Sequence, residues 1–443
     1  MDKIVCRRGK FMKKMTGVLA LAMALTPICN MSASAQTTTA ITDNGLYAVT
    51  VTLDPKDVEG IEVTGVGIKG EFLFYESNMT GHTDETGMLD GVEKYYTPSE
   101  YKDGMASIGG LYYEDMTLNE DGVYEVTLNL PAGVYPYQFV INPELGPESE
   151  WMTWANVITK TGEKGCFGFG DEEKNKSIPD PKNPPMNVTL TGTQSNSELI
   201  VGETARTPVD DPAQRGTVSF QSYTDLNGQV QTLGVYLPAG YDKTQSYPLI
   251  VLSHGRFGNE ADWFSQGQLN NIMDNLIAEG KTRPAIVVTP NGNVFQEEEY
   301  WNFEQYGKNI RECVLPYIES IYNVSTDLND RCFSGLSMGG MTTMHMFYNC
   351  TDLFGYYGAF SGAITPAMSS YNPDNPTIHN VKLFIGAGEE DYAYDGKEFA
   401  VKTAMEALDE LGVKYDSYFL TGAHDWFNWP EIFEYYVANV LWK

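Results

Sequence analysis

The chain has 443 residues, of which 42% are apolar and 12% aromatic, and it carries 59 acidic against 29 basic side chains, a formal net charge of −30. A nucleic-acid binder needs a basic surface, so this balance argues against a nucleic acid as partner. The aromatic content and the apolar runs exclude a wholly disordered chain, and the length leaves room for two or three domains.

Residues 1–35 have the three parts of a secretory signal peptide. Basic residues between Arg7 and Lys14 precede an apolar run from Val18 to Leu25, and Ala33-Ser34-Ala35 provides small residues at a cleavage site. We therefore expect a secreted or periplasmic protein that is cut after Ala35. No internal apolar stretch reaches the length of about 18 residues that a membrane span requires, so we expect no span.

The cysteines that follow the expected cleavage site show neither C-x-x-C spacing nor clustering with histidines. Either pattern would be typical of a zinc site. We therefore expect no metal and no other cofactor. Secretion permits disulfides, but the cysteines are few for a chain of this length, and we expect free, buried thiols. They are Cys166, Cys313, Cys332 and Cys350.

Residues 40–175 are predicted to form an all-β sandwich domain. Residues 48–53 and 70–75 are short runs of β-forming residues, and Gly122–Leu130 alternates with period two. The turn Pro131-Ala132-Gly133 and the run Val134–Ile141 follow, which predicts a hairpin. Residues 176–215 are rich in Pro, Thr, Ser and Gly and are expected to be a linker, in which 188–190 and 199–201 could be strands.

From residue 216 to 443, apolar strands alternate with amphipathic helices. This alternation predicts βαβ units and a mostly parallel sheet that helices cover on both faces. The expected strands are 231–237, 249–253, 285–289, 331–334, 356–361, 382–386 and 415–420, and the expected helices are 270–279, 303–321, 340–348, 399–411 and 429–442.

Gly335-Leu336-Ser337-Met338-Gly339 fits the pattern G-x-S-x-G between an expected strand and an expected helix. The glycines permit a turn so tight that a serine hydroxyl stands clear of the sheet, as in the nucleophile elbow of α/β-hydrolases. The helix that follows offers free N–H groups and a dipole that favour negative charge. We therefore predict an α/β-hydrolase fold with Ser337 as the catalytic nucleophile.

A serine hydroxyl needs a base, usually a histidine that a carboxylate orients, and in this fold the order is serine, acid, histidine. His345 lies in the expected helix after the serine, and His379 precedes a strand, at the wrong end of the sheet. His424 follows the last expected strand, where the base belongs. His254 precedes the serine, and we expect it to brace its own loop.

The acid should follow the strand 382–386, where Glu389, Glu390, Asp391 and Asp395 are all candidates. The sequence pattern leaves this choice open, and loop geometry favours Asp391. Two backbone N–H groups should bind the oxyanion of a tetrahedral intermediate. We expect those of Met338 and of Arg256, which lies in a loop after an earlier strand.

Residues 216–443 resemble the esterase-D-like branch of the α/β-hydrolases, and most of all the feruloyl esterase domains attached to bacterial xylanases. Collinear motifs carry the resemblance: Ser253-His254-Gly255, 259–264, 274–281, Val288-Thr289-Pro290-Asn291, 316–320, 335–340 and Gly422-Ala423-His424-Asp425. The resemblance implies a triad of Ser337, Asp391 and His424, with oxyanion donors at Arg256 and Met338. Relatives usually have a small or aliphatic residue where this chain has Arg256-Phe257. Residues 45–145 resemble, more weakly, the E-set or glycogen-binding-like sandwich that precedes such esterases.

Aromatic residues crowd the expected active-site loops, and half of them could be ordinary core residues. We expect Phe257, Trp263, Trp301 and Trp426 to bind substrate, as a cinnamoyl ring or a sugar face stacks well on aromatic rings. The expected function is release of ferulate or a related hydroxycinnamate from plant cell-wall xylan. The alternatives are an acetylxylan or siderophore-type esterase of the same fold and an inactive carbohydrate-binding protein.

All candidate catalytic residues follow residue 250. The sequence therefore predicts that the C-terminal part hydrolyses small aryl esters without help from the N-terminal part.

Overall fold

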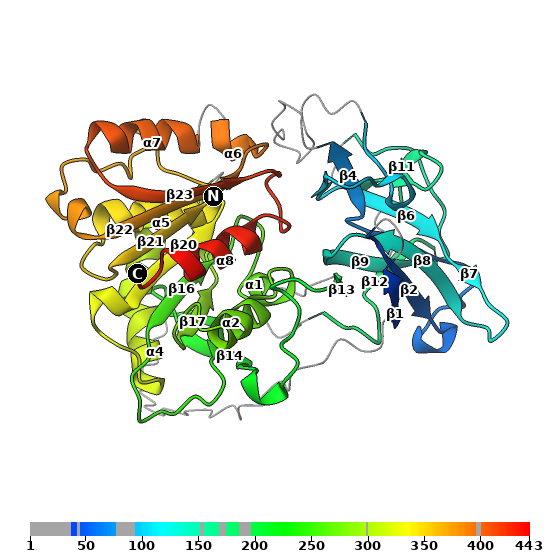
Figure 1. The fold of residues 1–443 in the computed structure, drawn as a ribbon, viewed down its shortest axis with the longest axis horizontal. Helices are drawn as coiled ribbons and strands as arrows, with labels where there is room; N and C mark the ends of the chain where they lie inside the picture. Colours follow the sequence, from blue (N-terminus) through cyan, green and yellow to red (C-terminus); the bar gives the residue numbers. More distant parts are fainter. Residues whose placement is uncertain are drawn as a thin grey trace, which may run out of the picture.

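The structure is a computed structural model that describes residues 37–41, 45–76, 94–150, 155–167, 174–185, 196–297, 300–395 and 400–443. The expected signal peptide and the possible strand 188–190 lie outside these residues. Figure 1 shows a β-rich N-terminal part, in blue and cyan, beside a larger part of mixed strands and helices.

Short strands make up the described N-terminal part. They are β1 (Thr37–Ile41), β2 (Tyr47–Leu53), β3 (Val66–Gly70), β4 (Leu73–Glu76), β5 (Met105–Ile108), β6 (Leu111–Asp115), β7 (Thr117–Leu118), β8 (Tyr124–Leu130), β9 (Gly133–Ile141), β10 (Asn156–Thr159), β11 (Lys164–Cys166), β12 (Lys176–Ile178) and β13 (Ser197–Val201). One sheet has the order β1–β2–β8–β7. Another has the order β11–β10–β6–β3–β9–β12, in which β13 also pairs with β9, and β4 pairs with β5.

The hairpin expected within residues 122–141 is wrong. β8 pairs with β2 and β7, whereas β9 pairs with β3, β12 and β13. The turn at Pro131 therefore carries the chain from one sheet to the other, and Leu130 of β8 and Phe139 of β9 meet in one buried core. Period-two alternation identifies a strand and its buried face, but it does not identify the neighbouring strand.

Two strands lie within the stretch 176–215 that the sequence assigns to a linker. Both β12 and β13 pair antiparallel with β9. The linker assignment is therefore wrong for β12. β13 was among the possible strands, and its Leu199 and Val201 are fully buried, so that hydrophobic burial fixes it to the sheet.

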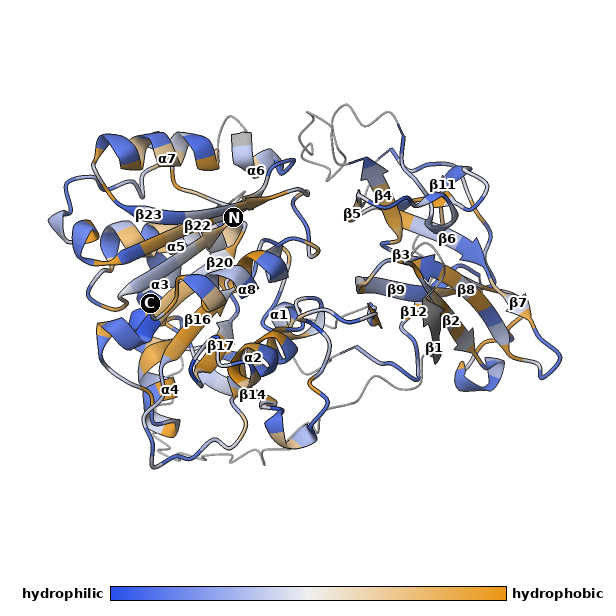
Figure 2. Ribbon diagram, viewed as in Figure 1, coloured by the Kyte–Doolittle hydropathy of each residue, from blue (hydrophilic) through white to orange (hydrophobic). Residues whose placement is uncertain are grey.

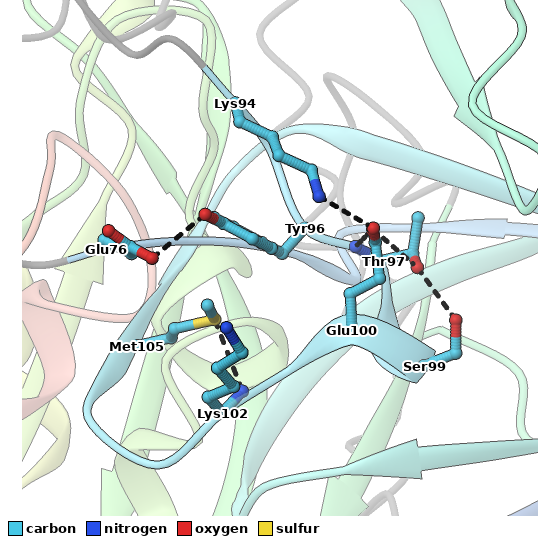
Figure 3. A network of polar contacts seen from close by, with 8 residues as sticks. All are labelled: Glu76, Lys94, Tyr96, Thr97, Ser99, Glu100, Lys102 and Met105. Carbon is cyan, nitrogen blue, oxygen red and sulfur yellow. Dashed lines mark hydrogen bonds and ion pairs between the residues drawn. The ribbon is translucent and has the colours of Figure 1, made fainter.

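Polar contacts fix the segment that begins at Lys94 (Figure 3). The short helix η2 (Pro98–Glu100) begins with a reciprocal cap, in which the backbone N–H of Thr97 donates to Glu100 Oε2 at 3.0 Å. Lys94 Nζ lies 2.9 Å from the other oxygen of that carboxylate. The Tyr96 hydroxyl donates to Glu76 at 3.0 Å, which ties this segment to the end of β4.

The C-terminal part contains a large sheet of order β14–β15–β17–β16–β20–β21–β22–β23 and a small hairpin β18–β19. The strands are β14 (Thr217–Thr224), β15 (Val230–Leu237), β16 (Leu249–Ser253), β17 (Ile286–Pro290), β18 (Gln296–Glu297), β19 (Tyr300–Trp301), β20 (Arg331–Leu336), β21 (Tyr356–Phe360), β22 (Lys382–Gly388) and β23 (Tyr415–Leu420). The helices are α1 (Asp262–Ser265), α2 (Leu269–Ala278), α3 (Phe303–Asn309), α4 (Leu315–Ile321), α5 (Met338–Asn349), α6 (Tyr392–Asp395), α7 (Val401–Glu410) and α8 (Trp429–Asn439). Short 3₁₀ turns are η4 (Pro212–Gln214), which precedes β14, and η5 (Asn293–Phe295), η7 (Leu328–Asp330) and η8 (Pro376–Asn380); η1 (Pro55–Asp57) lies in the N-terminal part.

Helices cover both faces of this sheet, so alternate residues of its strands are buried against different sets of helices. In β16, Leu249 and Val251 join a core with α3, α4, α5 and α7, whereas Ile250 and Leu252 join a core with α2 and α8. Within the large sheet, the neighbouring strands β17, β16, β20, β21, β22 and β23 run parallel to one another. Figure 2 shows apolar residues along β16 and β22. The α/β-hydrolase fold expected from the sequence is confirmed.

The expected long helix 303–321 is interrupted by a π-helical turn, η6 (Ile310–Val314), between α3 and α4. Pro316 lies in the first turn of α4 and has no N–H to donate to the carbonyl four residues earlier. A shift to wider hydrogen bonding accommodates this missing donor.

Cys166 and Cys332 are buried free thiols, as expected, whereas the free thiols Cys313 and Cys350 are half-buried. Among the described helices, none is long and apolar enough to cross a membrane.

Candidate active site

Ser337 lies at the tight turn between β20 and α5. Its φ of 51° and ψ of −116° place a non-glycine residue in a region that L-residues rarely adopt. A Cβ atom at Gly339 would lie 2.5 Å from the carbonyl oxygen of His254, and one at Gly335 would lie 2.7 Å from the backbone of Gly339. The two glycines of the motif therefore permit the close approach that the strained turn requires.

Ser337, His424 and Asp391 are hydrogen-bonded in series, although they come from three separate loops. Ser337 Oγ lies 2.9 Å from His424 Nε2, and His424 Nδ1 lies 2.9 and 3.0 Å from the two oxygens of Asp391. The Asp391 side chain is fully buried and the His424 side chain is 11% exposed. In this arrangement the imidazole can take the serine proton while a buried carboxylate holds the ring and stabilises its charged form.

The acidic residues after β22 point in different directions. Glu389 is exposed, whereas the buried Glu390 accepts the backbone N–H of Gly422 at 2.5 Å. Asp391 alone among the three reaches His424, and its Oδ1 also accepts the N–H of Ala393 at 2.7 Å. The side chain of Asp395, the fourth candidate, lies outside the description. The structure therefore brings together the three residues that the resemblance implied.

The other candidate histidines are occupied elsewhere. His254 is buried, and its ring nitrogens lie 2.6 Å from the Gly255 carbonyl oxygen and 3.0 Å from the Gly292 N–H, so it braces its loop. Burial lowers its pKa to about 4. Burial also lowers the pKa of His345 to about 4, and Nδ1 of that ring lies 3.1 Å from Ser370 Oγ. His379 lies in η8, exposed and ahead of β22.

The loop after β16 lies against the serine turn. A Cβ atom at Gly255 would be 3.2 Å from the Cβ of Ser337. Arg256 is the residue after Gly255 in this loop, and Met338 begins α5 directly after the serine. Helix α5 thus points its free N–H groups at the turn, where a developing negative charge is stabilised.

The four aromatic residues expected to bind substrate have very different surroundings. Phe257 is 85% exposed and has a φ of 64°, and the guanidinium of Arg256 lies 4.8 Å from its ring centre. Trp426 is half-buried, between Trp263 and Trp429, with ring centres 5.2 Å away in each case. Phe257 and Trp426 therefore keep surface that a ligand can reach.

Trp263 and Trp301 are corrections to the sequence analysis, because neither can serve as a substrate platform. Trp263 has no exposed surface, and its indole N–H donates to the carbonyl of Ser253 at 3.0 Å. Trp301 is 2% exposed, and its indole donates to Asn293 Oδ1 at 3.1 Å. Both indoles hold loops near the serine from within the core. Aromatic residues at loop positions look the same in sequence whether they face solvent or the core.

Sequence reasoning missed two residues that shape the site. Gly362 lies so close to the serine turn that a Cβ atom there would be 2.1 Å from the Ser337 carbonyl oxygen. Asn428 holds the histidine loop, because its side-chain amide donates to the carbonyl of Ala423 at 2.6 Å. A signal existed for Gly362, since it follows the strand next to the nucleophile strand, whereas an asparagine in a loop gives none.

Comparison with known proteins places the match in this C-terminal part. Residues 225–437 match the model of the family described as "Putative esterase". The chain is 33% identical over 235 residues to a protein of Xylanibacter ruminicola named endo-1,4-beta-xylanase/feruloyl esterase, and 30% identical over 253 residues to endo-1,4-beta-xylanase Y of Acetivibrio thermocellus. Each alignment covers 50% of this chain.

These relatives are much longer than the shared region. The alignments cover 30% and 23% of their lengths, so the chain spans less than a third of either relative. Among solved structures, a mutant of the feruloyl esterase module from Clostridium thermocellum complexed with sinapinate is 25% identical, with a TM-score of 0.45 over 54% of this chain and 91% of that one. Residues 225–437, which include the serine turn and the histidine loop, are therefore similar to the esterase family that bears that description.

Proposed function

We propose that the chain is a serine carboxylic-ester hydrolase that works through an acyl-enzyme on Ser337. The observation that carries the proposal is the continuous hydrogen-bond series from Ser337 through His424 to the buried Asp391. An inactive binding protein would have no need to keep a strained serine, an imidazole and a buried carboxylate in series, each within 3.0 Å of the next.

In the first half of the reaction, Ser337 Oγ attacks the ester carbonyl while His424 Nε2 takes the hydroxyl proton. The carbonyl oxygen becomes an oxyanion, which the backbone N–H groups of Arg256 and Met338 stabilise. The tetrahedral intermediate collapses when the bond to the alcohol oxygen breaks and His424 gives its proton to that oxygen. The alcohol leaves, and the acyl group stays on Ser337.

In the second half, water attacks the acyl carbonyl and His424 takes its proton. The bond between the carbonyl carbon and Ser337 Oγ then breaks, and His424 returns the proton to the serine. Asp391 hydrogen-bonds to Nδ1 of His424 in both halves of the reaction. Its role is to keep Nδ1 of His424 protonated, so that Nε2 faces the serine as a base.

The proposed substrate is a hydroxycinnamate ester of plant cell-wall xylan, with ferulate as the acyl group, and the proposed location is secreted or periplasmic. The name of the Xylanibacter relative, which joins xylanase and feruloyl esterase, supports this substrate class. The exposed ring of Phe257 beside the oxyanion loop offers a face for an aryl or sugar ring. The net charge of −30 disfavours an anionic siderophore ester.

Turnover of methyl ferulate, p-nitrophenyl acetate and feruloylated arabinoxylan by the wild-type chain and by Ser337→Ala tests the proposal. We expect the wild-type chain to release ferulate from the polymer and from methyl ferulate, and the variant to release none. Activity on acetyl esters alone would favour an acetylxylan esterase. No turnover of any ester would contradict the proposal and favour a carbohydrate-binding role.

A further inference from the structure

The loop that carries His424 reaches out of the hydrolase fold and contacts the N-terminal part. It spans residues 421–428, between β23 and α8, and Figure 1 shows it in red on the side that faces the N-terminal strands. Within the hydrolase, Asn428 donates to the Ala423 carbonyl, and Glu390 accepts the Gly422 N–H. These contacts hold the two ends of the loop, and contacts from outside the hydrolase add to those that hold its middle.

Phe427, three residues after His424, packs into the core of the N-terminal part. Its ring centre lies 5.5 Å from that of Tyr135 on β9, and it contacts the apolar cluster that the two N-terminal sheets share. Tyr135 is fully buried, and its hydroxyl donates to the Pro131 carbonyl at 3.0 Å. Tyr135, a fixed aromatic residue in the core of the N-terminal part, therefore restrains Phe427, and with it the histidine loop.

Arg206 holds the same loop from a second direction. Its Nη1 donates to the carbonyl oxygen of Trp426 at 3.1 Å. The backbone carbonyl of Arg206 accepts the side-chain amide of Asn271 at 2.8 Å, and Asn275 donates to the carbonyls of Ala205 and Thr207. Both asparagines lie on α2, so the segment that follows β13 is fixed to the hydrolase where Arg206 grips the loop.

The N-terminal part also approaches the loop at Asp425. A Cβ atom at Gly109 would lie 3.7 Å from Cβ of Asp425, the residue next to His424. Consecutive residues 425, 426 and 427 thus contact the N-terminal part or the segment that leads out of it. A shift of about 1 Å in a catalytic group can cost about 100-fold in rate, so these contacts bear on the chemistry.

We propose that the N-terminal part positions the catalytic histidine, with Phe427 and Arg206 as positioning residues, so that ester hydrolysis requires both parts of the chain. This inference rests on the proposed function. It replaces the prediction from the sequence that the C-terminal part hydrolyses esters without help from the N-terminal part. The positioning residues touch neither substrate nor reacting atoms, and they act through the loop that places Nε2 of His424 against Ser337.

The test uses the full chain with Phe427→Ala, Phe427→Leu and Arg206→Met, with Phe220→Ala as the matched control. Phe220 is also half-buried and packs edge-on against Phe264, with ring centres 6.1 Å apart, on the distant edge strand β14. Steady-state kinetics on p-nitrophenyl acetate and methyl ferulate separate kcat from KM, and thermal unfolding reports the folded fraction of each variant.

We expect Phe427→Ala to lower kcat about 10-fold or more with little change in KM, because both half-reactions use His424. Phe427→Leu, which keeps an apolar side chain, should recover most of kcat, and Phe220→Ala should keep wild-type kcat. Arg206→Met removes the hydrogen bond to the Trp426 carbonyl but keeps an apolar side chain. It tests the restraint of the loop even if Phe427→Ala fails to fold, and we expect it to lower kcat as well.

Wild-type kcat in folded Phe427→Ala or, should that variant not fold, in Arg206→Met would overturn the inference while ester turnover by the wild-type chain upheld the proposed function. An equal loss of kcat in Phe220→Ala would also overturn it, because the loss would then reflect general loosening. A wild-type chain that turns over no ester would overturn the proposed function itself, and the inference with it.

Discussion

Asp425 should make the stability of this protein fall as pH rises through the neutral range. The side chain is 8% exposed, and its Oδ1 accepts the N–H groups of Phe427 at 3.0 Å and Asn428 at 3.3 Å. Its Oδ2 has no hydrogen-bond partner among the residues that the structure describes. Burial, with the nearby charge of Asp391 as a smaller cause, raises its pKa from 3.8 to about 7.

The sign of the effect follows from the raised pKa. Between about pH 4 and pH 7 the folded state keeps a proton on Asp425 that the unfolded state releases, so unfolding becomes easier as pH rises. Each pH unit in this window weakens folding by about 1.4 kcal/mol, which gives at most about 4 kcal/mol across the window. Glu71 of the N-terminal part adds to the trend, because burial and the charge of Asp425 raise its pKa to about 8.

Asp425→Asn removes the titration of this residue with little change in shape. The amide oxygen still accepts both backbone N–H groups, although the amide N–H₂ gains no partner, which costs about 1–3 kcal/mol at every pH. The unfolding free energy of the variant minus that of the wild type should therefore rise by about 3 kcal/mol from pH 5 to pH 8.

Urea unfolding of both proteins at pH 5, 6, 7 and 8, followed by tryptophan fluorescence, measures this difference, because Trp426 lies in the loop and Trp429 follows it. The control is Asp374→Asn, since Asp374 is exposed and its replacement should leave the pH profile unchanged. Parallel profiles for the wild type and Asp425→Asn would refute the reasoning, because they would mean that Asp425 is ionised in the folded protein at pH 5.

Three further predictions concern catalysis. Ser337→Ala should lower kcat on methyl ferulate by about 10⁴-fold or more, as measured by ferulate release. Asp391→Asn should also lower kcat severely because the imidazole loses its orienting carboxylate, whereas Glu390→Gln should be far milder, since an amide oxygen can still accept the Gly422 N–H; the reverse order would mean that Glu390 is the acid. Incubation with EDTA should leave turnover intact because every proposed step uses protein groups, and activity that a divalent ion restores would contradict this.

The sequence predicted the hydrolase fold well, because this fold follows from local patterns. The expected strands and helices after residue 216 lie close to their places in the structure, since continuous apolar strands and amphipathic helices have different periods. The pattern G-x-S-x-G names Ser337 because the turn itself requires the glycines. Chain order then leaves His424 as the histidine after the last strand.

Other features depend on contacts between distant residues and could not be read from local patterns. The pairing of β9 with β3, β12 and β13 joins segments far apart in sequence, so alternation within residues 122–141 suggested the wrong partner. The burial of Trp263 and Trp301 follows from the packing of loops over the sheet. The insertion of Phe427 beside Tyr135 joins residues that are 292 positions apart, and no motif in the sequence marks that contact.

The central claim is that Ser337 carries the acyl group. An aryl ferulate has a good leaving group, so the acyl-enzyme should form faster than water removes it, and rapid acid quench followed by mass spectrometry can capture it. The account predicts one feruloyl group per chain, on the peptide that contains Ser337, with a matching burst of the aryl alcohol. A burst with the feruloyl group on another peptide, or steady turnover of the ester by Ser337→Ala at the wild-type rate, would contradict it.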